Sequence, residues 1–214
     1  MDGIKAILLD VDGTVLDTRE FIYQAAEYAL NTEGYPPVPR EQIARAVGHS
    51  FDDFYSIVLE KPDLEASALQ AAHRIFQLEH MDLSVPFPNA EETLIELKRR
   101  GYRLAAVTSR WRASVMATLD AARLTNLFDV VMAAGDSPEL KPSPMPLLMA
   151  LARMGCVASE AVMVGDTDID VEAGNAANMK TVRVRYGFMM SDGEKVKADF
   201  YIEKNISELL DLFP

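Results

Sequence analysis

The sequence contains a single cysteine, Cys156, among its 214 residues. It therefore cannot form an internal disulfide or a cysteine-based zinc site, which is typical of a protein in a reducing compartment. No apolar run reaches the ~18 residues that a membrane-spanning helix needs. The first apolar run is interrupted by Asp10, which does not fit a signal peptide. These absences predict a cytoplasmic protein without a membrane partner.

Positive charge is also scarce. The chain has 21 Lys and Arg against 33 Asp and Glu, a formal net charge of −12. An acidic surface repels polyanions, so we expect no nucleic-acid partner. A small phosphorylated metabolite is still compatible with this charge if a metal and a few cationic groups reverse the potential locally. Apolar residues make up 49% of the chain, enough for a full hydrophobic core in one or two domains.

Short apolar runs recur along the chain, and helical patterns lie between several of them. The runs predict buried parallel strands. Helices are expected at 90–100, after Asn89, and at 144–154, between Ser143 and Gly155. Alternating strands and helices predict an α/β fold with a doubly wound (Rossmann-like) parallel sheet. The expected strands cover residues 4–11, 103–107, 130–133, 161–164 and 181–184.

Residues 17–84 depart from this alternation and have helical patterns only. We expect helices at about 19–31, 40–47, 51–59 and 63–81, separated by prolines. The sequence therefore predicts an α-helical domain at 17–84, inserted into an α/β core domain formed by 1–16 and 85–214. The proline-containing segment 85–88 is expected to be the second hinge.

Four predicted strand ends carry polar groups, and ligands of open parallel sheets bind at such ends. The first strand ends in Asp10-Val11-Asp12-Gly13-Thr14. Carboxylates two residues apart in an extended segment point the same way, and their repulsion is costly unless a cation lies between them. Asp12-Gly13 alone is typical of an ordinary turn. A turn does not explain Asp10, a charge at the end of a buried strand.

The second and third strand ends supply hydroxyls and a lysine. Thr108 and Ser109 are candidates to donate to phosphoryl oxygens, although Thr and Ser after a strand are more often turn or cap residues. Lys141, just before Pro142, is a candidate to hold a point positive charge over the site. The alternative for Lys141 is a solvated surface side chain.

The fourth strand end reads Gly165-Asp166-Thr167-Asp168-Ile169-Asp170. Carboxylate oxygens suit Mg²⁺, and acidic residues also favour a helix N-terminus by capping and by the helix dipole. Both interpretations can hold for different residues. We take Asp168 as the solvated member of the three.

Together these motifs resemble the haloacid dehalogenase-like hydrolase superfamily, in the branch of phosphoglycolate phosphatases and β-phosphoglucomutases with an α-helical cap. The family pattern is DxDGT, a Thr or Ser, a lysine and a late GDxxxD. It is matched in order by Asp10 to Thr14, Thr108, Lys141 and Gly165 to Asp170. The resemblance covers essentially the whole chain, and the helical insert is similar to the family's cap.

The resemblance implies a Mg²⁺-dependent phosphatase acting through an aspartyl-phosphate. Asp10 would be the nucleophile, and Asp12 the acid and then the base. The resemblance also implies that Mg²⁺ is bound by Asp10, the main-chain carbonyl of Asp12 and Asp166, with Asp170 as a direct or indirect support. Thr108, Ser109 and Lys141 would bind phosphate. The substrate would be a small phosphate monoester, similar to phosphoglycolate.

Several points stay open at this level. Arg110 replaces the lysine of many relatives and is either a phosphate or carboxylate contact or a solvated loop residue. Cap residues that are candidates to set specificity are Tyr23, Arg45, His49 and Ser50, whereas His73 and His80 are interpreted as structural.

The alternatives within the family are a β-phosphoglucomutase-like mutase and a pyrophosphatase. Thr14 favours phosphatase over mutase by family analogy. Two further alternatives are a receiver-like signalling domain and a relative that binds phosphate without catalysis. The insert after the first strand disfavours the first, and the presence of Asp10 and Asp12 disfavours the second. The sequence does not identify the substrate, nor whether the protein is a monomer or a homodimer.

Overall fold

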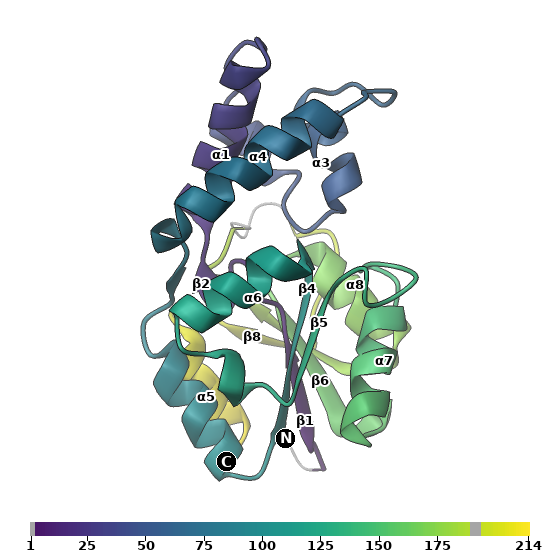
Figure 1. Cartoon of the computed structure of the whole chain (residues 1–214). Coiled ribbons are helices and arrows are strands. Elements are labelled where there is room, and N and C mark those ends of the chain that lie inside the picture. Colours follow the sequence, from purple (N-terminus) through teal and green to yellow (C-terminus); the bar gives the residue numbers. More distant parts are fainter. Residues whose placement is uncertain (1–2, 189–193) are drawn as a thin grey trace.

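The computed structural model describes residues 3–188 and 194–214. Its centre is a six-stranded sheet in which every neighbouring pair is parallel, in the order β5-β4-β1-β6-β7-β8 (Figure 1). The predicted doubly wound sheet is therefore confirmed. The strands are β1 (Ala6–Leu9), β4 (Arg103–Trp111), β5 (Val130–Ala134), β6 (Ala161–Gly165), β7 (Lys180–Val184) and β8 (Phe200–Ile202). The short edge strand β8 was not predicted.

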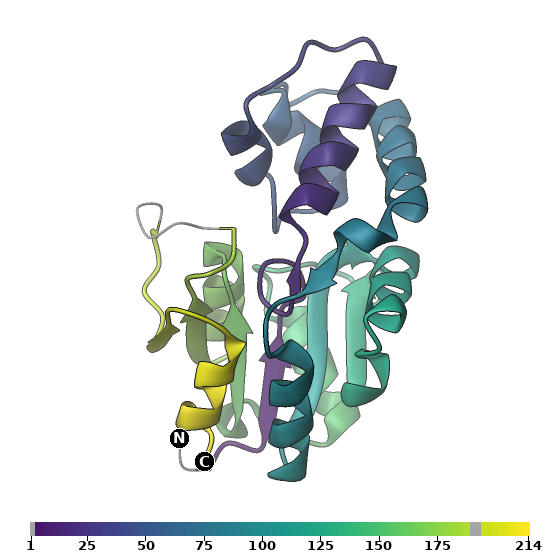
Figure 2. The ribbon, with the colours of Figure 1, turned by 90° about the vertical axis from the view of Figure 1, so that its left-hand side faces the viewer.

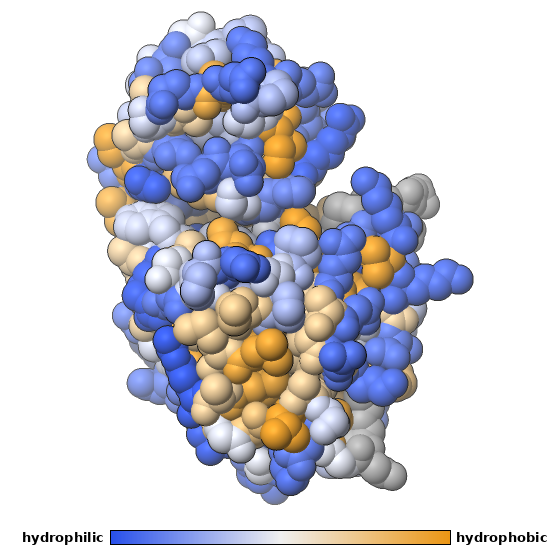
Figure 3. All heavy atoms as spheres, turned by 90° about the vertical axis from the view of Figure 1, so that its right-hand side faces the viewer, coloured by the Kyte–Doolittle hydropathy of each residue, from blue (hydrophilic) through white to orange (hydrophobic). Residues whose placement is uncertain are grey.

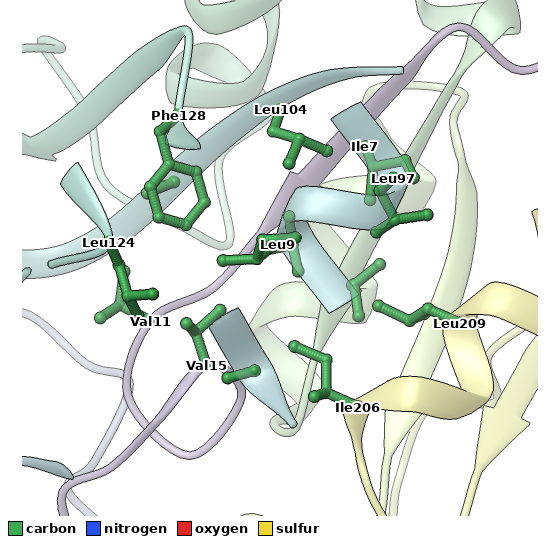
Figure 4. Close-up of a cluster of buried hydrophobic side chains, with 14 of the residues drawn as sticks. Ile7, Leu9, Val11, Val15, Leu97, Leu104, Leu124, Phe128, Ile206 and Leu209 are labelled. Atoms are coloured by element: carbon green, nitrogen blue, oxygen red, sulfur yellow. The ribbon is translucent and has the colours of Figure 1, made fainter. Parts of the chain in front are cut away.

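Alternate residues of β1 point to opposite faces of the sheet, and each face is covered by its own helices. Ile7 and Leu9 belong to an apolar cluster with α5 (Ala90–Arg99), α6 (Arg112–Ala121) and α9 (Leu209–Leu212), part of which is drawn in Figure 4. Ala6 and Leu8 belong to a second cluster with α7 (Met145–Met154) and α8 (Asp168–Ala176). A strand buried on both sides needs a continuous apolar run, which is the pattern that residues 4–11 carry.

A separate group of helices lies above the carboxyl end of the sheet (Figures 1 and 2). It has its own apolar cluster, which includes Phe21, Leu30, Ile43 and Tyr55. The chain enters and leaves this group through a two-stranded antiparallel ribbon. The division into domains at residues 17 and 85 stays a prediction. The elements are β2 (Leu16–Asp17), α1 (Arg19–Thr32), α2 (Arg40–Ala44), α3 (Phe51–Val58), α4 (Ser67–Glu79) and β3 (Val85–Pro86).

Two of the expected insert helices are shorter than predicted. α2 ends at Ala44, and α4 begins at Ser67 instead of residue 63. Residues before α4 form turns after Glu60, whose φ is +54°. Such a backbone cannot continue a right-handed helix. Further short 3₁₀ helices lie at Met81–Leu83, Thr125–Leu127, Ala158–Glu160 and Ile206–Glu208.

The surface of the sheet domain carries apolar side chains on the side of α7. Met145, Leu148 and Val157 are exposed there, and Figure 3 shows apolar surface on the lower lobe of this side. Among the described residues, no helix is both long and apolar enough to span a bilayer.

Candidate active site

The strand register brings the sequence motifs to one edge of the sheet. Leu9 of β1 pairs with Ala106 of β4 on one side and with Val164 of β6 on the other. The residues after these positions therefore lie side by side, and they include Asp10, Thr108 and Asp166. The Asp10 amide donates to the Val164 carbonyl at 2.8 Å, which continues the β1–β6 pairing up to the nucleophile candidate.

Lys141 reaches this edge from the segment after β5 and is only 5% exposed. Its ammonium donates to Asp10 Oδ1 at 2.7 Å, to Asp170 Oδ1 at 2.6 Å and to the Val107 carbonyl at 2.9 Å. These bonds use all three of its donors. Burial by itself would lower the pKa of Lys141, but the charges of Asp10 and Asp170 outweigh burial and raise it. The solvated alternative for Lys141 is therefore wrong.

Three buried carboxylates gather around this lysine. Oxygen atoms of Asp10, Asp166 and Asp170 all lie within 4.8 Å of one another. Burial raises the pKa of Asp10 to about 7 against the opposing charge of Lys141, and the charge of Asp170 adds to the rise. The pKa of Asp166 is raised well above its ordinary value by burial and by the charges of Asp170 and Asp10. One lysine does not balance three carboxylates, so the cluster favours a further cation.

The donor set fits a hard divalent cation such as Mg²⁺. Asp166 is fully buried; its Oδ2 accepts from the Phe188 amide at 2.6 Å, while its Oδ1 is buried without a hydrogen-bond partner among the described residues. Such an orphaned carboxylate oxygen beside two other carboxylates is chemically satisfied by a metal ion. Glycine is required around it, because a Cβ on Gly13 or Gly187 would lie 2.3 or 2.4 Å from Asp166 Oδ2.

Asp12 is part of a different contact. Its carboxylate is held by Arg110 through two guanidinium nitrogens, one of them Nε at 3.2 Å, and Thr108 Oγ1 donates to it at 3.4 Å. Arg110 also donates to Thr118 Oγ1 at 2.8 Å and lies over the Phe21 ring of α1 at 5.0 Å. Its side chain is 6% exposed, so the solvated alternative for Arg110 is wrong. Arg110 instead links Asp12 to α1.

The N-terminus of α8 combines capping and charge pairing. Thr167 is its N-cap, and Asp170 Oδ2 accepts from the Thr167 amide at 3.1 Å and from its hydroxyl at 2.7 Å. Asp170 thus caps the helix with one oxygen and binds Lys141 with the other.

The expectation that Asp168 is solvated is wrong. Arg183 of β7, 1% exposed, donates to Asp168 Oδ1 at 2.5 Å and to the Asp166 carbonyl at 3.2 Å. Sequence reasoning missed Arg183. The signal available was a lone charge within the otherwise apolar run 181–184.

A pocket that is partly open to solvent extends from Asp10 and Asp12 towards the inserted helices. Thr108 and Ser109 line it, as does His49 among the proposed cap residues. Its other lining residues are Ile22, Ala46, Val47, Gly48, Phe51, Phe54, His73, Gln77, Arg110, Trp111 and Thr167.

The other three cap candidates do not line this pocket and have different partners. Arg45 is exposed and lies 3.9 Å from Glu60. Ser50 caps α3 by accepting from the Asp53 amide. The ring of Tyr23 contacts the Phe188 ring edge-on, and the guanidinium of Arg40 lies over the Tyr23 ring. Sequence reasoning missed Gln77 and Trp111, which line the pocket because α4 and the end of β4 fold together over the strand edge.

The structure combines a parallel sheet, a helical insert after β1 and an acidic cluster beside a buried lysine. This combination defines a class of hydrolases. The model of the haloacid dehalogenase-like hydrolases matches residues 7–184. The chain belongs to this family and is a hydrolase of the phosphatase type.

Relatives within the family cover almost the full chain. Pyrophosphatase PpaX of Bacillus cereus is 34% identical over 209 residues, covering 97% of this chain and 95% of that protein. PpaX of Bacillus velezensis is 35% identical over 211 residues with the same coverage. Among solved structures, a predicted phosphoglycolate phosphatase from Haemophilus somnus has a TM-score of 0.89 at 24% identity and covers 99% of each chain. A predicted phosphatase from Clostridium acetobutylicum has a TM-score of 0.87 at 21% identity, covering 98% of this chain and 97% of that one.

Proposed function

We propose that the protein is a Mg²⁺-dependent phosphatase that hydrolyses a small phosphate monoester through an aspartyl-phosphate on Asp10. One observation carries the proposal: the buried Lys141 binds Asp10 and Asp170 beside Asp166 Oδ1, which has no hydrogen-bond partner in the described part of the chain. This arrangement leaves an ionised carboxylate next to a place where a cation and a phosphoryl group neutralise the remaining negative charge.

In the first step, a carboxylate oxygen of Asp10 attacks phosphorus, and the bond from phosphorus to the leaving oxygen breaks. Asp12 gives its proton to the leaving alcohol. In the second step, Asp12 takes a proton from water, whose oxygen attacks phosphorus and releases inorganic phosphate with regeneration of Asp10. The contact of Asp12 with Arg110 holds its carboxyl group in the lining of the pocket.

The other polar groups bind and balance charge. Thr108 and Ser109 are proposed to hold the phosphoryl oxygens, since both line the pocket. Lys141, whose three donors are engaged, is proposed to bind the phosphoryl group through its positive charge beside Asp10. Asp10, Asp166 and the Asp12 carbonyl would hold Mg²⁺, with Asp170 as a further support; when bound, the ion supplies positive charge for the transferring phosphoryl group. Residues 17–84 are proposed to act as a cap domain that shields this reaction from bulk water.

A second candidate function is pyrophosphate hydrolysis. It is supported by the name of the curated relatives that match the chain at 34–35% identity. The same groups would perform it, with phosphate in place of an alcohol as the leaving group.

The proposal is tested with Asp10→Asn, assayed by phosphate release from a panel of phosphate monoesters and pyrophosphate with Mg²⁺ and with a chelator. We expect wild-type turnover with Mg²⁺, loss of it with the chelator, and loss of turnover in Asp10→Asn. Asp17→Asn is the matched control, because Asp17 pairs with Arg19 away from the cluster. Retained phosphatase activity in Asp10→Asn would contradict the mechanism.

A further inference from the structure

The two ends of the pocket differ in charge. At the strand edge, the lining residue Asp10 is in contact with Lys141, and the positive charge of Lys141 and of the proposed cation favours a phosphoryl group there. Towards the cap, the only permanently cationic side chain among the described lining residues is Arg110, and its charge is already engaged by Asp12. Arg74 lies over the rings of Phe51 and Trp111 at 5.1 and 5.7 Å and is not part of the lining.

The two histidines of the lining do not alter this balance at the buried end. His73 is 2% exposed, and the Tyr55 hydroxyl lies 2.8 Å from its Nδ1. Burial, helped by the charges of Arg110 and Arg74, lowers the pKa of His73 to about 3, so its imidazole is neutral at pH 7. His49 is exposed to solvent, where water screens any charge it carries.

Towards the inserted helices, the remaining lining consists of apolar side chains and one hydrogen-bonding side chain, that of Gln77. Ile22, Val47, Phe51 and Phe54 supply apolar surface. Gln77 is 5% exposed, and its Oε1 accepts from the Ser114 hydroxyl at 3.2 Å.

This bond engages the Oε1 side of the Gln77 amide. Its Nε2 has no hydrogen-bond partner among the described residues, although the side chain lines the pocket. An amide N–H of this kind, on a largely buried side chain that lines the pocket, is placed to donate a hydrogen bond to a ligand atom.

We propose that the leaving group of this phosphatase is an uncharged alcohol that has an apolar face and accepts a hydrogen bond from Gln77. The inference rests on the phosphatase function proposed above. The net reaction is hydrolysis of R–O–PO₃²⁻ by water to R–OH and inorganic phosphate, in which R is uncharged.

A carboxylate or a second phosphate on R would be placed in a partly buried, aromatic pocket next to Asp12, where no described lining residue offers a free cation, at a large desolvation cost. The proposal therefore separates this chain from the functions named for its relatives. Pyrophosphate has phosphate as its leaving group and phosphoglycolate has glycolate, and both leaving groups are anionic.

The first experiment compares kcat/KM with Mg²⁺ for matched pairs of esters. Ethyl phosphate is paired with 2-phosphoglycolate, and glycerol 3-phosphate with 3-phosphoglycerate, so that a carboxylate is the main difference within each pair. In both pairs we expect kcat/KM to be at least about tenfold higher for the ester whose leaving group is uncharged. Pyrophosphate should have a lower kcat/KM than ethyl phosphate and glycerol 3-phosphate.

Equal or higher kcat/KM for the carboxylates or for pyrophosphate would overturn the inference while leaving the phosphatase function intact. No hydrolysis of any ester or of pyrophosphate would overturn both.

The second experiment uses Gln77→Leu, with Gln70→Leu as the matched control on the same helix, since Gln70 donates to the Phe51 carbonyl and does not line the pocket. The ratio of kcat/KM for glycerol 3-phosphate to that for phenyl phosphate should fall about tenfold in Gln77→Leu, as expected for one lost hydrogen bond. In Gln70→Leu the ratio should stay within twofold of wild type. A ratio that falls equally in both variants, or in neither, would overturn the role of Gln77.

Discussion

Lys141 Nζ lies 2.7 Å from Asp10 Oδ1, and the two residues are separated by 131 positions in the sequence. The same ammonium donates to Asp170 at 2.6 Å. Removing a buried cation from such a group leaves uncompensated carboxylates, and this is more damaging than the loss of a surface ion pair.

Lys141→Met should therefore abolish most turnover and destabilise the fold. We expect kcat to fall by about 10²–10³ and the free energy of unfolding to fall by about 3–5 kcal/mol. Mg²⁺ should restore part of the stability, because it compensates the same carboxylates. Urea unfolding with and without Mg²⁺ measures this. Lys180→Met, at an exposed pair with Asp199, serves as control. Equal destabilisation in both variants would refute the special position of Lys141.

Asp166→Asn should separate metal binding from folding. The carboxylate of Asp166 is fully buried, and one of its oxygens has no partner within residues 3–188 and 194–214. A neutral amide therefore removes a buried charge and should raise the Tm of the metal-free protein. The Mg²⁺-induced rise in Tm should be lost, whereas a wild-type site filled at 100 times its Kd gains about 2.7 kcal/mol. Thermal unfolding across a Mg²⁺ titration measures both effects. A variant that keeps the full Mg²⁺ shift would show that Asp166 is not a ligand.

Arg110→Lys should impair the chemical step more than substrate binding. Lysine cannot reproduce the two-nitrogen contact of Arg110 with Asp12 or its position over Phe21. We expect kcat to fall by about 10- to 100-fold with a smaller change in KM. Arg112→Lys is the matched control, since Arg112 pairs with Asp136 on the exposed surface. Steady-state kinetics distinguish the two, and a change confined to KM would argue that Arg110 only binds substrate.

His73 should make stability depend on pH. Its pKa is lowered to about 3 in the folded protein, first by burial, whereas the unfolded state has a value near 6.5. As pH falls from 6.5 towards 3, only the unfolded state takes up this proton. The free energy of unfolding therefore does not depend on this group above pH 6.5. Below pH 6.5 it falls by about 1.4 kcal/mol per pH unit.

The measurement is denaturant unfolding between pH 7.5 and 4.5 for wild type, His73→Gln and the exposed-site control His80→Gln. The wild type and His80→Gln should lose stability more steeply than His73→Gln. Parallel slopes in all three proteins would disprove the assignment.

Local sequence patterns were sufficient for much of the sheet. The strand around Leu8 and Leu9 is buried on both faces, so it needs an unbroken apolar run, and such a run is visible without the structure. The alternation of strands and helices then dictates a parallel sheet, whose carboxyl ends share one edge. Asp10, Thr108 and Asp166 could be grouped in this way because each follows a strand. Their chemical roles stay predictions.

Partnerships between side chains required the tertiary structure. Lys141 was ambiguous between a site residue and a solvated one until its burial against Asp10 was seen. The pairing of Arg183 with Asp168 spans β7 and α8, and no local pattern distinguishes a buried arginine from an exposed one.

The Asp10 motif thus came from the sequence alone, since strand periodicity and turn chemistry are short-range. The pocket that faces it was decided by how the inserted helices pack against the strand ends. Gln77 of α4 reaches Ser114 of α6 only because two helices distant in sequence meet above the strand edge. Contacts of that kind depend on how all the side chains between the helices and the sheet pack together. They therefore have no local sequence pattern from which they could be predicted.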